Sequence, residues 1–135
     1  MSGEQPTLPA FYLRAFEQLR KFQVESTCPK TGNFPWCARP STVVEVTEFL
    51  TSAHAHDLVE PTLTLGIDGA VSVIWHENAW WISADFSNAA YIYAISRVPG
   101  NGHPGVIKAG HSPTNVICDV MIDYVRQVYQ DKQNE

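Results

Sequence analysis

The chain has 135 residues, 44% of them hydrophobic, which fits one domain (residues 1–135) with a sizeable buried core and excludes a disordered protein. Its 9 basic and 14 acidic side chains give a formal net charge of −5, and the basic residues are scattered along the sequence. Because nucleic-acid affinity depends on clustered Lys and Arg, we expect no nucleic-acid partner; a protein partner with a basic surface suits this charge better.

Membrane insertion and secretion are not indicated either. No apolar run reaches the roughly 18 residues of a membrane span, and no charged N-terminal region is followed by an apolar stretch. We therefore expect no membrane partner and a cytoplasmic protein. Cys28, Cys37 and Cys118 form no C-x-x-C pair, which is typical of reduced thiols, with a Cys28–Cys37 disulfide as the alternative.

The first predicted element is a helix that begins at about Leu8, after a flexible lead of residues 1–7. Thr7 has the position of an N-cap, and Glu17 and Lys21 have the spacing of an ion pair on the wet face. Apolar residues recur every three or four positions, as on one buried helix face. They are Leu8, Phe11, Ala15, Leu19 and Phe22, with Tyr12 and Phe16 beside them.

A loop over residues 26–40 follows, because it holds three prolines, a glycine and an asparagine. Its Phe34 and Trp36 are expected to pack back onto the domain. A second helix is predicted from about Ser41 to about His54, and Thr42 and Glu45 have the spacing of a capping box.

From Pro61 the apolar period changes to two, which predicts strands instead of helices. The predicted strands are residues 62–65, 70–76, 80–86 and 91–98. Short turns join them, one carrying Asp68-Gly69, so neighbouring strands must run antiparallel. Because a strand alternates, Trp80 and Trp81 must point to opposite faces of this sheet.

The last third of the chain begins with a loop over residues 99–105, rich in glycine and proline. Residues 106–108 form a possible edge strand, and Ser112-Pro113 has the pattern of an N-cap and first helical residue. The final helix should end near Gln130, with residues 131–135 flexible. The whole chain thus predicts an α+β fold, a four- to five-stranded antiparallel β-meander with helices mainly on one face, in the order α-α-β-β-β-β-α.

Two stretches carry a recurrent structural pattern. Residues 33–41 (Asn-Phe-Pro-Trp-Cys-Ala-Arg-Pro-Ser) form a Trp-containing loop that leads through Ala-x-Pro into a helix. Residues 61–75 run from a proline through a short strand and Asp-Gly to a strand that ends in Trp. Over roughly residues 33–95, this pattern resembles that of small uncharacterised bacterial proteins. The resemblance implies an α+β fold and carries no activity.

The five histidines do not form a recognisable metal site or catalytic set. His54 and His56 are two residues apart and cannot share one helix face. His76, His103 and His111 would converge only if the 99–105 loop folded over the sheet, and no Cys or carboxylate stands at zinc spacing beside them. No cofactor, metal or catalytic residue is therefore assigned, and an enzyme is the less favoured interpretation.

An exposed Trp with neighbouring Tyr side chains has the composition of an interface hot spot. The favoured hypothesis is a non-enzymatic protein-binding module, a small bacterial or phage inhibitor of the antitoxin, immunity or anti-defence (anti-CRISPR) type that occludes a partner protein. The candidate partner-binding residues are Trp81, Asp85, Tyr91, Tyr93, Asn101 and His103.

Two alternatives stay open. The first is a small enzyme or ligand-binding domain with a pocket near Trp81, Asp85, His103 and His111. The second is a homodimer joined through a sheet edge or through the exposed Trp.

Overall fold

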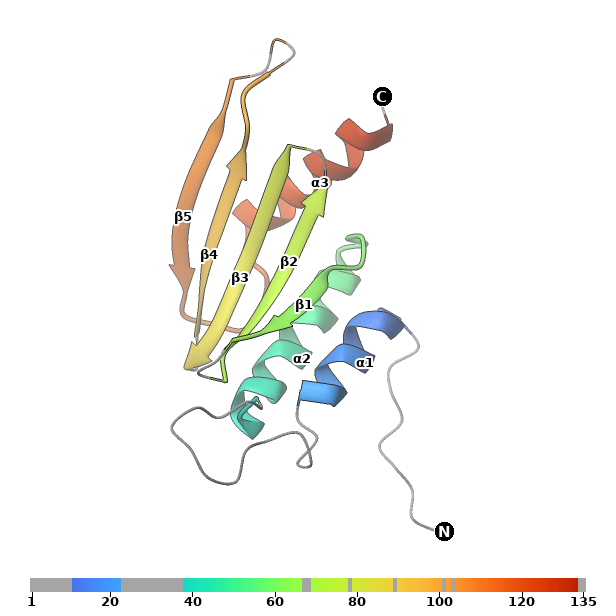
Figure 1. Ribbon diagram of the computed structural model, residues 1–135, viewed down its shortest axis with the longest axis vertical. Helices are drawn as coiled ribbons and strands as arrows, with labels where there is room; N and C mark the ends of the chain where they lie inside the picture. The colour runs from blue at the N-terminus through green and yellow to red at the C-terminus, as the bar shows by residue number, and fades with distance from the viewer. Residues whose placement is uncertain are drawn as a thin grey trace.

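In the part of the chain that the structure describes, five antiparallel strands form one sheet in the order β1-β2-β3-β4-β5, the order of the chain (Figure 1). They are β1 (Thr62–Leu65), β2 (Val71–Glu77), β3 (Trp80–Asn88), β4 (Ala90–Arg97) and β5 (Val106–Ser112). This computed structural model describes residues 11–22, 38–66, 69–77, 79–88, 90–100, 102 and 104–133. The predicted β-meander is confirmed, with the edge strand present.

Within the described ranges, three helices lie against one face of the sheet (Figure 1). They are α1 (Leu13–Phe22), α2 (Pro40–Ala55) and α3 (Asp119–Gln133). α1 packs beside β1, α2 beneath β2 and β3, and α3 beneath β2, β3 and β4. The α+β class and the one-sided packing of the helices are therefore as predicted, and the opposite face of the sheet is turned to the viewer in Figure 1.

The core lies between the sheet and the helices, at an aromatic cluster around Phe49 of α2. The Phe49 ring is fully buried and lies 5.0 to 6.1 Å, centroid to centroid, from three rings of the sheet. Those rings belong to Trp75, Phe86 and Tyr91, one from each of the three central strands. Each aromatic side chain buries a large apolar area, so this cluster joins the two layers most strongly.

Helix α1 begins at Leu13. The predicted helix is therefore wrong at Phe11 and Tyr12, which precede α1; the predicted start at Leu8 lies outside the described residues. Tyr12 has φ +49°, a left-handed conformation that an α-helix does not continue. Its hydroxyl donates a hydrogen bond to the Leu58 carbonyl oxygen at 2.6 Å. On the wet face, Glu17 pairs with Arg20 at 3.0 Å instead of with Lys21.

Helix α2 is confirmed, but its predicted capping box is wrong. Arg39 is the N-cap, makes no side-chain capping hydrogen bond, and precedes Pro40 in the first turn. Thr42 and Glu45 are buried among the core-facing residues of the helix instead. A proline at the helix start needs no capping acceptor for its own nitrogen, because it has no N–H.

The predicted start of the last helix at Ser112-Pro113 is also wrong. β5 extends to Ser112, which pairs with Tyr91 of β4, and α3 begins only at Asp119. The Tyr91 hydroxyl donates to the Val116 carbonyl oxygen at 2.8 Å and accepts from the Cys118 N–H at 2.9 Å. These bonds hold the connector between β5 and α3 in a non-helical path. Several residues of the sequence predictions lie outside the described part of the chain: Cys28, Phe34, Trp36, Cys37, Asp68, Asn101 and His103.

Candidate functional site

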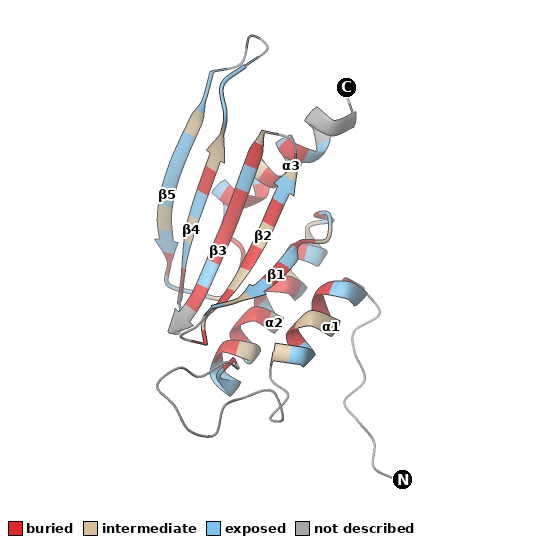
Figure 2. Cartoon of the chain, viewed as in Figure 1, coloured by how far each residue is buried: buried red, intermediate tan, exposed pale blue. Residues whose placement is uncertain are grey.

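The candidate site is the face of the sheet that no described helix covers, here called the open face (Figure 2). The strand register arranges its side chains in three rows across β2, β3, β4 and β5. The first row is Ser72, Asp85, Ile92 and His111; the second is Ile74, Ser83, Ala94 and Ala109; the third is His76, Trp81, Ser96 and Ile107. Alternation along each strand sends the residues between these to the helix side of the sheet.

Large apolar side chains are exposed on the open face. Ile92 is 64% exposed, Ile107 is 90% exposed and Trp81 is 42% exposed. The middle row is made mostly of small side chains, so it forms the floor between two taller rows. Contiguous exposed apolar groups bounded by polar ones mark interaction surfaces in soluble proteins. The open face therefore has the composition of a site for a macromolecule.

The two adjacent tryptophans of β3 separate as the sequence predicts. Trp80 is buried, with its ring 5.7 Å from the Tyr124 ring of α3 and with the Arg97 guanidinium 5.4 Å from its centroid. Trp81 stands on the open face, where the His76 ring lies 5.1 Å away. An aromatic side chain half in contact with its neighbours and half free is the kind of group that dominates binding energy at interfaces.

Asp85 is the acidic side chain of the open face. Its Oδ1 accepts a 2.6 Å hydrogen bond from the Ser72 hydroxyl on the neighbouring strand. This bond fixes the carboxylate in the first row, four residues along β3 from Trp81. A basic group of a partner would meet a preoriented carboxylate at this position.

Two other candidate residues, Tyr91 and Tyr93, do not join this site. Tyr91 is fully buried on the helix side of the sheet, so its place among the partner-binding residues is corrected: it is a core residue. Tyr93 lies on the same side, half-buried across from Gly110. Asn101 and His103 lie outside the described residues. Sequence reasoning missed Ile92 and Ile107, which alternation with Tyr91 and with Val106 could have placed on the open face.

Gly110 is required by the close approach of Tyr93. A Cβ at residue 110 would lie 2.6 Å from the Tyr93 Oη, so the ring would have to move. We expect Gly110→Ala to lower the free energy of unfolding by about 1–3 kcal/mol. In a Tyr93→Ala background the same substitution should cost much less, because its obstacle is gone. Urea unfolding of the parent chain, the two single variants and the double variant measures both free-energy changes. If Gly110→Ala cost the same with and without the Tyr93 ring, the close approach of Tyr93 to residue 110 would be contradicted.

Two adjoining cavities lie at the β1–β2 side of the molecule, away from Asp85 and His111. Their volumes are about 290 and 250 Å³, and Val59 and Tyr129 line both of them. Arg14, Glu60, His76 and Glu77 are among the residues that line the second. Within the open face, Asp85 and His111 share a row with Ile92 between them, and neither lines either of these two cavities.

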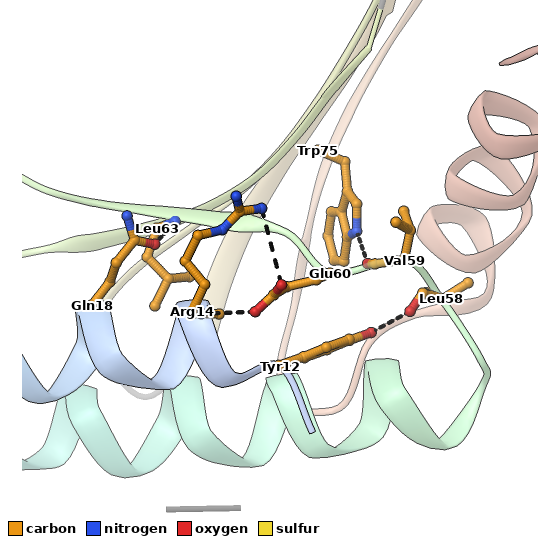
Figure 3. Close-up of polar contacts among 9 residues, drawn as sticks. Tyr12, Arg14, Gln18, Leu58, Val59, Glu60, Leu63 and Trp75 are labelled. Atoms are coloured by element: carbon orange, nitrogen blue, oxygen red, sulfur yellow. Dashed lines mark hydrogen bonds and ion pairs between the residues drawn. The ribbon is translucent and has the colours of Figure 1, made fainter. Parts of the chain in front are cut away.

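The segment from Leu58 to Leu63 that borders these cavities is fixed by polar contacts (Figure 3). The Val59 carbonyl oxygen accepts a 2.7 Å hydrogen bond from the Trp75 indole N–H. A Glu60 carboxylate oxygen accepts one from the Ala15 N–H at 2.9 Å, and the other lies 4.0 Å from the Arg14 guanidinium. The segment that borders the cavities is therefore held in place by contacts with α1 and β2.

Within the described residues, no three His, Cys, Asp or Glu side chains are placed to hold a metal ion. None of the described helices has the length and apolar character needed to cross a membrane. No protein-family model, curated protein or solved structure matches this chain. The resemblance to small bacterial proteins noted for residues 33–95 therefore stays a prediction.

Proposed function

We propose that this protein is a non-enzymatic protein-binding module that occludes a partner through its open face. One observation carries the proposal: a whole sheet face exposes Trp81, Ile92 and Ile107 without a described helix over it. Asp85 and the net charge of −5 favour a partner whose contact surface is basic.

The biological class that suits such a module is a small bacterial or phage inhibitor, of the antitoxin, immunity or anti-defence (anti-CRISPR) type, acting in the cytoplasm. Such an inhibitor needs only a stable scaffold and a surface complementary to its target. The preoriented acidic and aromatic groups of the open face support this class.

The test is co-purification with the natural partner from the cells that encode the gene, followed by titration of the purified pair. Trp81→Ala is expected to weaken partner binding by roughly 30-fold or more, the effect of truncating an aromatic hot spot. Tyr129→Ala is the control, because Tyr129 is a similarly exposed aromatic residue that lies on α3 and belongs to none of the three rows of the open face; it lines the second cavity together with Ile74 and His76. Both variants should unfold cooperatively like the parent chain.

A second candidate, a ligand-binding domain, is favoured by the two adjoining cavities at Val59 and Tyr129. The same pair of variants separates the two functions. If Tyr129→Ala lost partner binding while Trp81→Ala bound like the parent chain, the functional site would be the cavities and not the open face.

A further inference from the structure

The two edge strands of the sheet differ in how well they are protected from pairing with another strand. β1 is four residues long and follows Pro61, and α1 packs along it. The Gln18 side chain of α1 accepts a hydrogen bond from the Leu63 N–H at 3.1 Å (Figure 3). Short length, a proline and a covering helix are the devices by which proteins stop an edge strand from pairing with another chain.

The β5 edge has almost none of these devices. β5 is seven residues long and contains no proline, and its pairing with β4 runs without a bulge from Val106 to Ser112. No described strand lies beyond it. Its one charged residue is Lys108, whose ammonium group lies on the helix side, 5.9 Å from the centroid of the Tyr124 ring. A long, regular edge of this kind presents unpaired backbone donors and acceptors to a further strand.

Apolar side chains flank the β5 edge in both layers of the molecule. Ile107 is 90% exposed on the open face. On the helix side, Tyr124 lies near Lys108, and Val120, one turn earlier on the same side of α3, is 38% exposed. Val116, in the connector between β5 and α3, is also exposed. A second strand at this edge would therefore bury apolar surface as well as pair its backbone.

We infer that the occupant of the β5 edge is a second copy of this chain, paired antiparallel, with Ala109 opposite Ala109 of the second copy. This register uses all seven residues of β5. It places Lys108 opposite Gly110 of the second copy, where no side chain competes for space. A register centred on Lys108 would instead oppose two like charges and shorten the ladder, which is unfavourable.

A two-fold axis perpendicular to the sheet is required, because only then do the open faces of both copies lie on the same side. The helix layers of the two copies then also lie on one side of the joined sheet, and in each copy Tyr124 of α3 lies near Lys108 of the edge strand. Stable dimers bury about 800 Å² on each partner, more than a single strand edge supplies. Ile107 at the edge and Val116 in the connector that follows β5 are exposed apolar side chains that can add to this area.

The dimer makes one continuous sheet, with the five strands of each chain joined at β5. It presents two open faces side by side, so a partner with two equivalent sites would bind with increased avidity. The pairing does not depend on the proposed partner-binding function, because it leaves Trp81 and Asp85 outside the contact.

The first experiment is size-exclusion chromatography with light scattering on the full chain over a wide range of concentrations. The expected mass is twice the 15.1 kDa of one chain. Ile107→Lys should reduce the mass to that of one chain, since it places a charge beside the edge. Ile92→Lys is the matched control on the open face of β4, away from the edge, and should leave the dimer intact. A monomeric parent chain at all concentrations would overturn the inference, as would a dimer lost in Ile92→Lys and kept in Ile107→Lys.

The second experiment tests the register at the two-fold axis. Ala109 is exposed, so Ala109→Lys and Ala109→Asp should fold, and each alone should be monomeric because it opposes its own charge. When mixed, the two variants should form a heterodimer with the mass of two chains. Failure of the mixture to associate, with the parent chain dimeric, would exclude the Ala109-centred pairing.

Discussion

Replacing Phe49 by alanine is expected to lower the free energy of unfolding by about 3–5 kcal/mol, the cost of deleting a large buried ring. Phe49 is fully buried and its ring contacts Trp75, Phe86 and Tyr91. The cavity left behind would border all three central strands, so neighbouring side chains cannot easily fill it. Urea unfolding followed by tryptophan fluorescence and by circular dichroism measures the change.

Val44→Ala is the control for this prediction, because Val44 is on the same helix but is exposed. Its effect should stay within about 0.5 kcal/mol, as for other surface substitutions. If Phe49→Ala cost no more than Val44→Ala, the contact of α2 with the sheet would have to be different from the one described.

The second large effect is a loss of stability at alkaline pH, caused by two buried tyrosines. Burial raises the pKa of Tyr12, and the nearby charges of Glu60 and Asp57 raise it further. Burial is also the largest cause of the raised pKa of Tyr91. In the unfolded chain both phenols have the ordinary pKa of about 10.

The raised pKa values determine whether alkaline pH stabilises or destabilises the folded protein. Because both folded-state pKa values are raised, the stabilisation is fully present below pH 10 and is lost as the pH rises above it. Each tyrosine contributes a slope of about 1.4 kcal/mol per pH unit, so the pair gives about 3 kcal/mol per unit until the folded groups ionise.

Urea unfolding at a series of pH values from neutral to strongly alkaline measures this slope. Tyr12→Phe and Tyr91→Phe should each remove about half of the excess slope, and the double variant should remove nearly all of it. Other ionising groups are the same in all four proteins, so the differences isolate the two phenols. An unchanged slope in both single variants would contradict the assignment.

Tyr91→Phe should also weaken the protein at neutral pH, for a reason separate from ionisation. The Tyr91 hydroxyl bonds to Val116 and Cys118, so its loss leaves a carbonyl oxygen and an N–H without this partner. Its pH slope, rather than its neutral stability, is therefore the quantity to compare with Tyr12→Phe.

The sequence predicts the meander well because local signals determine it. Period-two alternation in Val71, Val73 and Trp75 and short turns between strands fix both the strands and their antiparallel order. The end of β5 and the start of α3 depend instead on distant contacts. Ser112 belongs to a strand because Tyr91 pairs with it, a contact between residues far apart in sequence. The left-handed conformation of Tyr12 likewise accompanies a bond to Leu58, 46 residues away.

The candidate site was predicted in part. Alternation placed Trp81 and Asp85 correctly on one face of β3. The residue type of Tyr91 suggests a binding role, whereas the face on which it lies depends on how β4 joins β3. The register shifts between Phe86 and Asn88, and Tyr91 then faces Phe86 in the core while Ile92 faces Asp85 on the open face. The register between two strands cannot be read from the sequence of either strand alone.

The two-layer arrangement separates the residues that stabilise the protein from those free to meet a partner. Along β3, Trp80, Ile82, Ala84 and Phe86 are buried against the helices, and the residues between them face outward. Substitutions at the exposed outward positions, Trp81 and Asp85, leave the core packing unchanged. A protein built this way can acquire a new binding specificity through several surface changes, each nearly neutral for folding, before any compensating change in its interior is needed.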